Sequence, residues 1–555
     1  MDEVEVGDLK VKPVLNVDRK EVHPAIGVVD GEAYVGVWVP SVITGKGGNI
    51  SYRDLLYMVT SRREMILANE EVLRKRNWRL EYKPIKFQNR WSLSDVQAYL
   101  GGASVLPSQV FSHVLEAWMK YIEFPGISEY VYHTLWTIGT YFHHLFNAYP
   151  YAYIGGVKKT GKTKSLTLYY CLAFNAIFSN NMSASSIYRL IQNAKATMLI
   201  DETEKLSNPE RALEFRSILL SGYKKGGRVY RCEKTRKELI QPEAFEVYSP
   251  KALANIRGLE DVLEDRCKVT ILRRSRDKKV VNKDVEVNDE AWSELRNELY
   301  LLFLGSFREV QEIYDQLGEL GEPSELVNVI KSQCSGDFNI NNLDLLISRE
   351  LELWKPIFAL ALFFDRKRVD LNKFTSSPSS LCSLMLRLAA ENAKQHQVED
   401  MTETGEALLV QVLCNLVLED DYYQVKITKE KMAKLFDEEQ KWLTTRWVSS
   451  ALRRLGFKEK RRLGTGYEYR LTKRDVEDLA LRMGIEKQEQ SLEEKLSEIK
   501  QWIGLNKDAD DLVDVFALTE HVKSLTEDDP SRIIEILKRD GQLFNVSKVG
   551  RLGVK

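Results

Sequence analysis

One short stretch of the sequence combines glycine, lysine and threonine at the spacing of a phosphate-binding loop. It reads Gly156-x-x-x-x-Gly161-Lys162-Thr163, which fits the P-loop pattern without a mismatch. The backbone N–H groups of such a loop, together with the dipole of the following helix, attract phosphate oxygens. Lys162 is placed to reach the β- and γ-phosphates of a nucleotide, and the hydroxyl of Thr163 is placed to hold Mg²⁺.

The flanking residues predict the elements that this loop needs. The apolar run Tyr151–Ile154 predicts a buried strand, and residues 164–178 predict the helix that follows. The alternative, a Gly- and Lys-rich surface turn, does not account for a strand before the loop and a helix after it. The residues predicted to bind the nucleotide are Gly156, Lys159, Thr160, Gly161, Lys162, Thr163 and Lys164.

Two adjacent carboxylates provide the second half of a nucleotide site. Residues 196–200 are apolar and predict a strand that ends in Asp201 and Glu202, about 40 residues after the loop. In this arrangement the strand delivers Asp201 towards Mg²⁺, directly or through water, while Glu202 orients the water that attacks the γ-phosphate. Paired acids at a strand end are common at a solvent edge, so the interpretation depends on the preceding loop.

A basic turn follows along the chain. Residues 229–232 and 238–240 predict two short strands, and the segment between them carries Lys234, Arg236 and Lys237. A hairpin at this place can reach a phosphate backbone in a central pore. The alternative is a solvated charged hairpin. The next apolar run, 244–254, predicts a core strand.

Arg266 lies between a short helical segment and the β-branched run 269–272. An arginine in this position can project from one subunit onto the γ-phosphate held by its neighbour, where its planar cation neutralises transition-state charge. The alternative is a surface salt bridge with Asp261, Glu264 or Asp265. The first interpretation implies that the protein acts as an oligomer.

The loop, the segment Leu199–Glu202, the basic hairpin and the segment Asp265–Cys267 together resemble an AAA+ ATPase with a hairpin before its sensor strand. Residues 150–365 are most similar to the helicase part of archaeal, plasmid and phage primase–helicase proteins, and more distantly to minichromosome-maintenance helicases. The resemblance implies that Asn255 lies near the sensor-one position, with Ser249 as the alternative.

The same resemblance extends to a helical lid. The segment Ser348–Pro356 is similar to the lid of this family, which implies that Arg349 touches the nucleotide as a sensor-two arginine. The alternative is an ordinary ion pair on the helix surface with Glu352 or a neighbouring acid. The catalytic residues predicted or implied are Lys162, Glu202, Asn255, Arg266 and Arg349, and the metal ligands are Thr163 and Asp201.

Residues 405–480 predict a winged helix-turn-helix. A helix over 428–437 and a second over 444–456 precede two strands around Gly464-Thr-Gly466. From Ser450 to Arg474 there are nine Lys and Arg against two Glu, which favours a DNA-binding surface over a protein-interaction module. The second helix is expected to present Arg446, Ser449, Ser450 and Arg453 to a groove, and the wing to place Lys458, Lys460, Arg461 and Arg462 on phosphates.

The pattern of elements predicts a multidomain protein of the α/β and α class. The expected segments are a β-rich N-terminal domain over 1–95 that includes a helix over Tyr52–Lys75, a helical collar over 96–148, a P-loop AAA+ core with a parallel sheet over 149–275, a helical lid over 276–400, the winged helix-turn-helix over 405–480, and a helical or winged tail over 486–555. Packing or oligomerisation is the role expected of the first segment, with DNA binding as the alternative. A primase activity is not expected there, because residues 1–100 carry neither an acidic triad nor a zinc pattern.

Composition argues against several classes of protein. The 555 residues carry a net charge of −1, so affinity for nucleic acid must come from local patches. The six cysteines lie far apart without a Cys-x-x-Cys pair, which argues against a disulfide framework or a cysteine zinc site. The first residues are acidic and unlike a signal peptide. The longest apolar runs, such as Ile357–Phe364, fall short of the ~20 residues that span a bilayer. A cytoplasmic location without a membrane partner is expected.

These observations predict an ATP-driven DNA helicase or translocase of the AAA+ class, using ATP and Mg²⁺ and acting in DNA replication as a homo-oligomeric ring, a hexamer. Two alternatives stay open. One is an AAA+ switch or loader that assembles on DNA without unwinding it, and the other is a DNA-binding regulator that uses ATP only as a signal. A strand-displacement assay and the response of ATP turnover to DNA distinguish the three.

Overall fold

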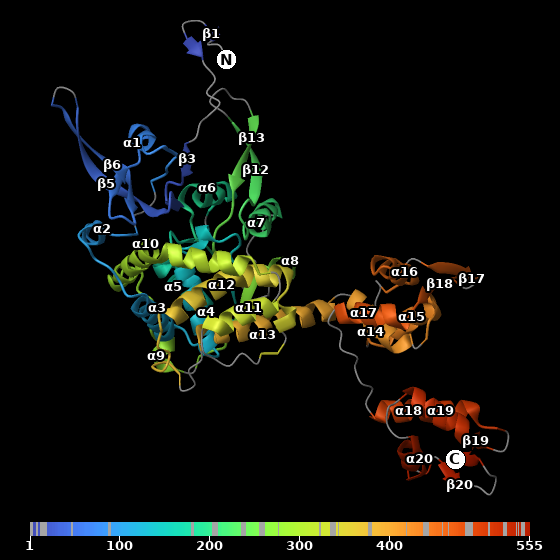
Figure 1. Ribbon diagram of the computed structural model, residues 1–555. Helices are drawn as coiled ribbons and strands as arrows, with labels where there is room; N and C mark the ends of the chain where they lie inside the picture. The colour runs from blue at the N-terminus through green and yellow to red at the C-terminus, as the bar shows by residue number, and fades with distance from the viewer. Residues whose placement is uncertain are drawn as a thin grey trace. The chain divides into compact units, whose positions relative to one another are not determined.

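The computed structural model (Figure 1) describes most of the chain in two compact units, Met1–His396 and Gln397–Lys555. The residues described are 4–6, 9–11, 19–45, 48–86, 90–178, 182–201, 209–234, 240–254, 261–275, 277–320, 323–333, 340–341, 343–375, 380–403, 405–417, 419–436, 443–457, 459–463, 466–482, 492–508, 511–525, 530–539, 541, 543–545 and 550–554. Within these ranges, every helix is too short or too polar to traverse a lipid bilayer.

A five-stranded parallel sheet forms the centre of the first unit. Its strands are β9 (Tyr151–Gly155), β10 (Ile177–Phe178), β11 (Met198–Asp201), β14 (Lys251–Ala254) and β15 (Cys267–Ile271), in the spatial order β10-β11-β14-β9-β15. All residues of β9 and β14 are buried, as expected for a parallel sheet whose two faces are both covered by helices. Strands β9, β11 and β15 lie where the apolar runs predicted them.

The single strand expected over 244–254 is wrong in its extent. Strand β13 (Ile240–Glu246) ends before this sheet and pairs with β12 (Arg228–Lys234), and β14 begins only at Lys251. The chain changes sheets at Ser249 and Pro250, because a proline lacks the N–H that a continuous ladder requires. The sequence-predicted hairpin is therefore longer than expected, and its described arms run from Arg228 to Lys234 and from Ile240 to Glu246.

Helices cover the sheet and continue through residues 276–400, the segment that was predicted to be a lid. They include α2 (Leu93–Leu100), α3 (Pro107–Tyr121), α4 (Ile127–Gly139), α5 (Lys162–Leu172), α6 (Ala184–Ala194), α7 (Pro209–Ser221), α8 (Asp261–Glu264), α9 (Lys278–Val281), α10 (Ala291–Gly318), α11 (Pro323–Gln333), α12 (Ser348–Arg366) and α13 (Leu381–Glu403). Most aromatic side chains of the expected collar are buried. Trp118 on α3 and Trp136 on α4 pack against Tyr169 on α5, with ring centroids 4.7 and 4.5 Å apart.

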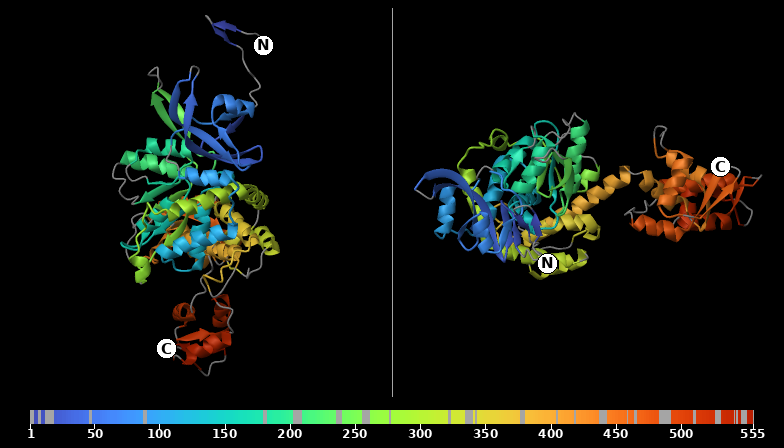
Figure 2. Two further views of the ribbon diagram at one scale, coloured as in Figure 1. Left: turned by 90° about the vertical axis from the view of Figure 1, so that its left-hand side faces the viewer. Right: turned by 90° about the horizontal axis from the view of Figure 1, so that it is seen from above.

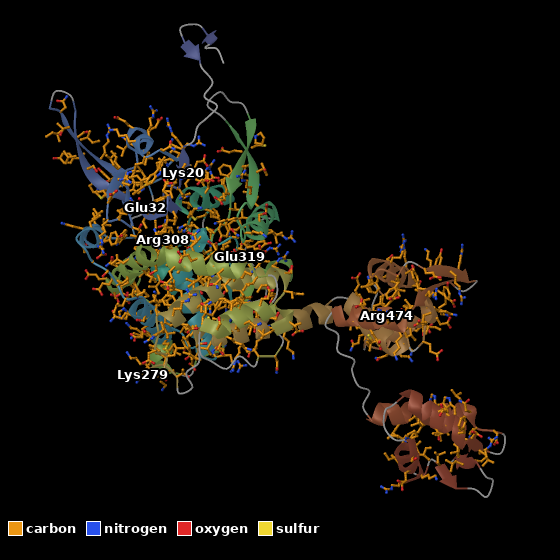
Figure 3. All side chains as sticks on the ribbon, viewed as in Figure 1. Lys20, Glu32, Lys279, Arg308, Glu319 and Arg474 are labelled. Carbon is orange, nitrogen blue, oxygen red and sulfur yellow. The ribbon has the colours of Figure 1, made fainter. Side chains whose placement is uncertain are left out.

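The N-terminal residues form a second sheet that shares the hydrophobic core of the first. Its strands are β4 (Ile26–Val29), β5 (Glu32–Thr44), β6 (Ile50–Thr60) and β7 (Met65–Leu67), and the short strands β3 (Lys20–Val22) and β8 (Trp78–Leu80) pair beside it. One continuous core contains Ile26 and Val59 of this sheet, Trp118 of α3 and Phe303 of α10. Arg308 lies on α10 (Figure 3). Its guanidinium donates to the Gly31 carbonyl oxygen at 2.9 Å.

The helix expected over Tyr52–Lys75 is wrong for most of its length. Residues Ile50–Thr60 form β6 and pair with β5 from Thr44↔Ile50 to Tyr34↔Thr60, and only Glu70–Lys75 is helical, as α1. Pairing with a 13-residue neighbouring strand outweighs the local preference of the sequence, since strand preference depends on cross-strand packing. Figure 2 shows that the β5–β6 hairpin and the β12–β13 hairpin extend from the same end of the first unit.

The second unit contains two modules with the same order of elements: helix, strand, helix, helix, strand, strand. The first comprises α14 (Gly405–Leu416), β16 (Asp421–Gln424), α15 (Val425–Ala433), α16 (Thr445–Arg454), β17 (Lys460–Leu463) and β18 (Gly466–Leu471), followed by α17 (Lys473–Arg482). The second comprises α18 (Leu492–Asn506), β19 (Leu512–Asp514), α19 (Val515–Leu525), α20 (Pro530–Arg539), β20 (Leu543–Asn545) and β21 (Arg551–Val554). In each module the last strand lies in the middle of a three-stranded antiparallel sheet, and each has its own hydrophobic core.

Candidate functional site

The glycine-rich loop joins the end of β9 to the start of α5, as the sequence predicted. Gly156 and Gly161 have φ angles of 139° and 100°, in the left-handed region that favours glycine. A Cβ atom at Gly156 would lie 2.5 Å from the Leu272 carbonyl oxygen, so a larger residue does not fit there. The loop therefore has a shape that brings backbone N–H groups to the N-terminus of a helix, which is a site for anions.

The side chains of the loop fold back onto its own backbone. The Lys162 ammonium donates to the carbonyl oxygens of Gly156 at 2.6 Å and of Val157 at 2.8 Å. The Thr160 hydroxyl also donates to the Val157 oxygen, at 3.0 Å. Lys159 has a φ of 66° and an exposed side chain. The Lys162 ammonium thus lies over the loop, in a position to contact a phosphate bound there.

Thr163 and Asp201 meet at the same edge of the sheet. The Thr163 hydroxyl donates to the Asp201 carboxylate at 2.9 Å. Strand register explains the contact, since Asp201 pairs with Ala254 and Ala254 pairs with Ile154, just before the loop. Hydroxyl and carboxylate oxygens suit Mg²⁺, which takes its other ligands from water and phosphate. Such a pair fits a nucleotide-bound cation, and no group of three or more His, Cys, Asp or Glu forms a separate metal site in the described ranges.

Two predicted residues at this edge, Glu202 and Asn255, lie outside the described residues. The alternative to Asn255 does not fit the geometry. Ser249 is fully buried before the first residue of β14, where its backbone N–H donates to the Gly222 oxygen and its hydroxyl lies 3.3 Å from the Lys251 ammonium. Because β14 runs from that end towards the loop, Ser249 lies at the opposite edge of the sheet and cannot contact a phosphate at Gly156–Thr163.

Lys164 does not point to the phosphate site that was predicted for it. Its ammonium donates to the Val280 carbonyl oxygen at 2.8 Å, on the short helix α9. Burial lowers the pKa of this lysine from its ordinary value. Lys164 therefore connects the helix that follows the loop to the linker after β15. A Cβ atom at Gly161 would lie 3.9 Å from the side chain of Ile122, so the end of α3 also borders the loop.

Arg266 and Arg349 lie together near the N-terminal end of β15, at the end of the sheet opposite the loop. Arg266 precedes β15, and its carbonyl oxygen accepts a hydrogen bond from the Tyr151 N–H, at the start of β9. Its side chain is buried, with the guanidinium 5.1 Å from the ring centroid of Tyr223 and Nε donating to the Leu220 oxygen at 3.2 Å. Arg266 thus does not project freely from the surface of the subunit.

Arg349 pairs with a residue from another element. Its guanidinium donates to the Asp265 carboxylate at 2.8 Å, and 39% of its side chain is exposed. Glu352, the partner considered from sequence, instead forms an ion pair with Lys224. A β-strand of five residues separates this pair from the loop, a distance of about 17 Å. Neither arginine can therefore contact a nucleotide bound to its own subunit in this arrangement.

Sequence reasoning missed two arginines that hold the helix following the loop. Arg90 donates to the carbonyl oxygens of Tyr170 and Cys171, and Arg296 donates to the Cys171 oxygen at 2.8 Å. These carbonyls belong to the last turn of α5, whose partial negative charge attracts cations. Arg296 comes from α10 and Arg90 from the segment before α2. No local signal in the sequence indicates these contacts, which join residues up to 125 positions apart.

The described part of the basic hairpin is its base. Val229 and Phe245 are buried against α6 and α7, in a cluster that includes Tyr188 and Ile218. Lys234 ends β12, and Arg236 and Lys237 lie outside the described residues. The hairpin is thus anchored by apolar side chains at its base.

In the first C-terminal module, three of the six predicted basic residues line one cleft. Arg446 and Arg453 on α16 and Lys460 on β17 line it, together with Ser449 and Ser450. The Ser449 hydroxyl is hydrogen-bonded to the Tyr469 hydroxyl at 2.9 Å. Lys458 lies outside the described residues, and Arg462 is exposed on β17. Sequence reasoning missed Lys426 and Tyr467, which also line the cleft.

Arg461 does not have the role that was predicted for it. Its Nε donates to the buried Glu468 carboxylate at 2.7 Å, and its guanidinium stacks 3.9 Å from the ring centroid of Tyr422. The alternation of side chains along β17 directs Arg461 to the face opposite Lys460. It holds the sheet of the module together and is not available to a phosphate in the cleft.

The parallel sheet, its glycine-rich loop and the Thr163–Asp201 contact are compatible with a P-loop AAA+ fold. No protein-family model and no curated protein matches the sequence. A solved structure described as "SCCmec type IV Cch - active helicase" aligns at a TM-score of 0.34 and 12% identity, over 86% of this chain and 100% of that one. The crystal structure of Cdc6p from Pyrobaculum aerophilum aligns at 0.15 and 12%, over 68% and 99%. At these TM-scores neither likeness carries an argument about this chain.

Proposed function

We propose that the chain is an AAA+ ATPase that unwinds or translocates DNA as an oligomeric ring of six subunits. The observation that carries the proposal is the convergence of Lys162, Thr163 and Asp201 at one edge of the sheet. Loop N–H groups and Lys162 would hold the phosphates of ATP, and Thr163 and Asp201 would hold Mg²⁺. Glu202 would orient the attacking water, so that the bond between the γ-phosphorus and its bridging oxygen breaks and ADP leaves.

The position of the two arginines supports a site shared between subunits. Arg266 and Arg349 lie about 17 Å from the loop of their own chain, at the far edge of the sheet. A head-to-tail ring joins two different surfaces at every interface, and in the proposed ring the far end of the sheet in one subunit would face the loop of the next. Arg349, with its partly exposed side chain, is the more accessible of the two, and Arg266 would require Tyr223 to release it.

Two basic elements support DNA as the partner. In the sequence, Arg236 and Lys237 follow Lys234, the last residue of β12. The β12–β13 hairpin would contact the DNA strand in the ring through these cations. The order of elements in the first C-terminal module supports a winged helix-turn-helix, with α16 as the recognition helix and β17–β18 as the wing. This module would anchor the ring to DNA.

Steady-state ATP hydrolysis tests the proposed site. Lys162→Ala is expected to reduce turnover at least about 100-fold, because the cation nearest the phosphates is lost. Lys158→Ala is the matched control, since Lys158 is an exposed lysine of the same loop without an assigned contact. Equal turnover in the two variants would remove the loop from the proposed mechanism.

A strand-displacement assay tests whether the protein uses ATP hydrolysis to unwind DNA. Neutralising Lys234, Arg236 and Lys237 together is expected to abolish unwinding of a forked duplex while ATP hydrolysis continues. If the wild-type protein hydrolyses ATP but displaces no strand, the function is that of a switch or loader instead. If unwinding survives the triple substitution, the hairpin does not contact the translocating strand.

A further inference from the structure

The cleft of the first C-terminal module has a volume of about 500 Å³ and opens between α15, α16 and the β17–β18 hairpin. This volume falls within the ~300–1,000 Å³ typical of sites for small molecules. Its lining residues come from the end of β16, from α15 and α16, and from β17 and β18. The cleft therefore accepts a group the size of a nucleotide.

The charge of the cleft favours phosphate. Four exposed cations from three elements line it: Lys426 on α15, Arg446 and Arg453 on α16, and Lys460 on β17. The one acid in the lining, Glu468, is buried and neutralised by its ion pair with Arg461 at 2.7 Å. None of the four cations forms an ion pair with a carboxylate of the described residues. A concave surface with this charge concentrates anions.

An aromatic side chain stands among these cations. Tyr467 on β18 is 43% exposed, and the Lys460 ammonium lies 4.9 Å from the centroid of its ring. An exposed ring in a basic cleft is a platform on which a nucleobase can stack. In a continuous duplex the faces of the bases are covered by their neighbours, so only an unpaired base can use such a platform.

We propose that this cleft holds one unpaired nucleotide where double-stranded DNA opens into a single strand. The base stacks on Tyr467, and the four cations bind the phosphates on either side of it. The inference rests on the proposed DNA-binding role of the module and makes that role more specific. The module then recognises a junction, whereas α16 alone would recognise any duplex.

Fluorescence anisotropy of the full-length chain tests the inference with three labelled DNAs: a blunt duplex, the same duplex with a single-stranded arm, and the single strand alone. The Tyr467→Ala variant is expected to weaken binding of the armed duplex and to leave blunt-duplex binding within about twofold. Base–aromatic stacking contributes ~1–3 kcal/mol per base, which corresponds to about 5- to 150-fold in affinity. Tyr467→Phe, which keeps the ring, should retain the preference for the armed duplex.

Two substitutions separate the charge from the stacking. Lys460→Gln is expected to weaken binding of all three DNAs and to reduce its salt dependence. Arg470→Gln is the matched control, because Arg470 is an exposed cation on β18 that pairs with Glu459 at 3.2 Å and does not line the cleft. A 2-aminopurine placed at the junction should be quenched by the wild-type chain and by Tyr467→Phe, but not by Tyr467→Ala.

Four results would overturn the inference. Equal weakening of blunt and armed duplex by Tyr467→Ala, or no change in either, would mean that no base stacks on this ring. Preferential binding of an acidic peptide that displaces DNA would identify a protein site. If Lys460→Gln weakens binding of all three DNAs while Tyr467→Ala keeps the preference for the armed duplex, no unpaired base stacks on Tyr467. The proposed DNA-binding role of the module then stands without recognition of a junction. If Lys460→Gln changes no DNA affinity, both the junction inference and the DNA-binding role fail.

Discussion

If the nucleotide site is shared between subunits as proposed, the activity of mixed oligomers can be predicted quantitatively. Arg266 lies about 17 Å from the loop of its own subunit. At this separation, the attraction between two unit charges is roughly 1 kcal/mol even at an effective dielectric constant of ~20, which is a factor of about 5 in rate. An arginine that contacts the γ-phosphate contributes a factor of about 10³–10⁵ instead. A large effect of Arg266→Gln therefore requires contact with a neighbour's nucleotide.

Mixing two inactive variants measures this directly. Lys162→Ala removes the loop lysine and Arg266→Gln removes the cation, and each is expected to be nearly inactive alone. In a randomly assembled 1:1 mixture, about a quarter of the interfaces join an intact loop to an intact arginine. ATP hydrolysis should then recover to about a quarter of the wild-type rate per subunit. Glutamine keeps much of the packing against Tyr223, and circular dichroism checks that the variant folds.

The assay is steady-state hydrolysis at constant total subunit concentration, with fluorescent labels that report subunit exchange. Repeating it with Arg349→Gln distinguishes the two arginines at this edge. If mixed oligomers form and no activity returns with either arginine variant, neither side chain acts across an interface. The reasoning from the position of these residues would then be refuted.

Three further predictions concern the site and its support. Thr163→Ala removes the 2.9 Å hydrogen bond from the threonine hydroxyl to Asp201, and a hydrogen bond to a charged group contributes about 1.5–3 kcal/mol. The Mg²⁺ concentration for half-maximal ATP hydrolysis should therefore rise about tenfold or more. Thr163→Ser keeps the hydroxyl and should leave this concentration unchanged. Glu129→Gln leaves the buried Lys268 ammonium without its ion pair and should lower the free energy of unfolding by about 3–5 kcal/mol, measured by thermal denaturation; an unchanged melting temperature would contradict this role. Burial lowers the pKa of His133 well below 6.5, so below about pH 6.5 the unfolded chain binds a proton that the folded chain does not. The free energy of unfolding should therefore fall as the pH drops from 7 to 5. The fall should be smaller in His133→Gln, which cannot bind this proton.

The nucleotide edge was predictable because its signals are local. The spacing of Gly156, Gly161 and Lys162 defines a loop, and the apolar residues on either side define the strand and helix that form it. Asp201 ends an apolar run, so its place at a strand end also follows from the sequence. The contact with Thr163 then results from the general rule that parallel strands deliver their C-terminal ends to one edge.

The parts that could not be predicted depend on distant partners. Residues 50–60 form a strand only because residues 34–44 lie beside them. Arg349 pairs with Asp265, 84 residues earlier in the chain, and no rule of helix spacing identifies that partner. Arg461 forms an ion pair with Glu468 and does not contribute to the cleft. The pairing register of β17 and β18 fixes the alternation of side chains, so Lys460 faces the cleft and Arg461 does not.

The continuous core of the first unit has a consequence for how such a chain can be altered in evolution. Apolar side chains of the N-terminal sheet, of the helices before β9 and of the helices after β15 belong to one cluster that extends from Ile26 to Ala393. A deletion or exchange that ends inside this range exposes the apolar surface of what remains, which costs stability in proportion to its area. The two later modules each bury their own core. Recombination is therefore expected to preserve Met1–His396 as one inherited block, while the modules that follow can be replaced or lost individually.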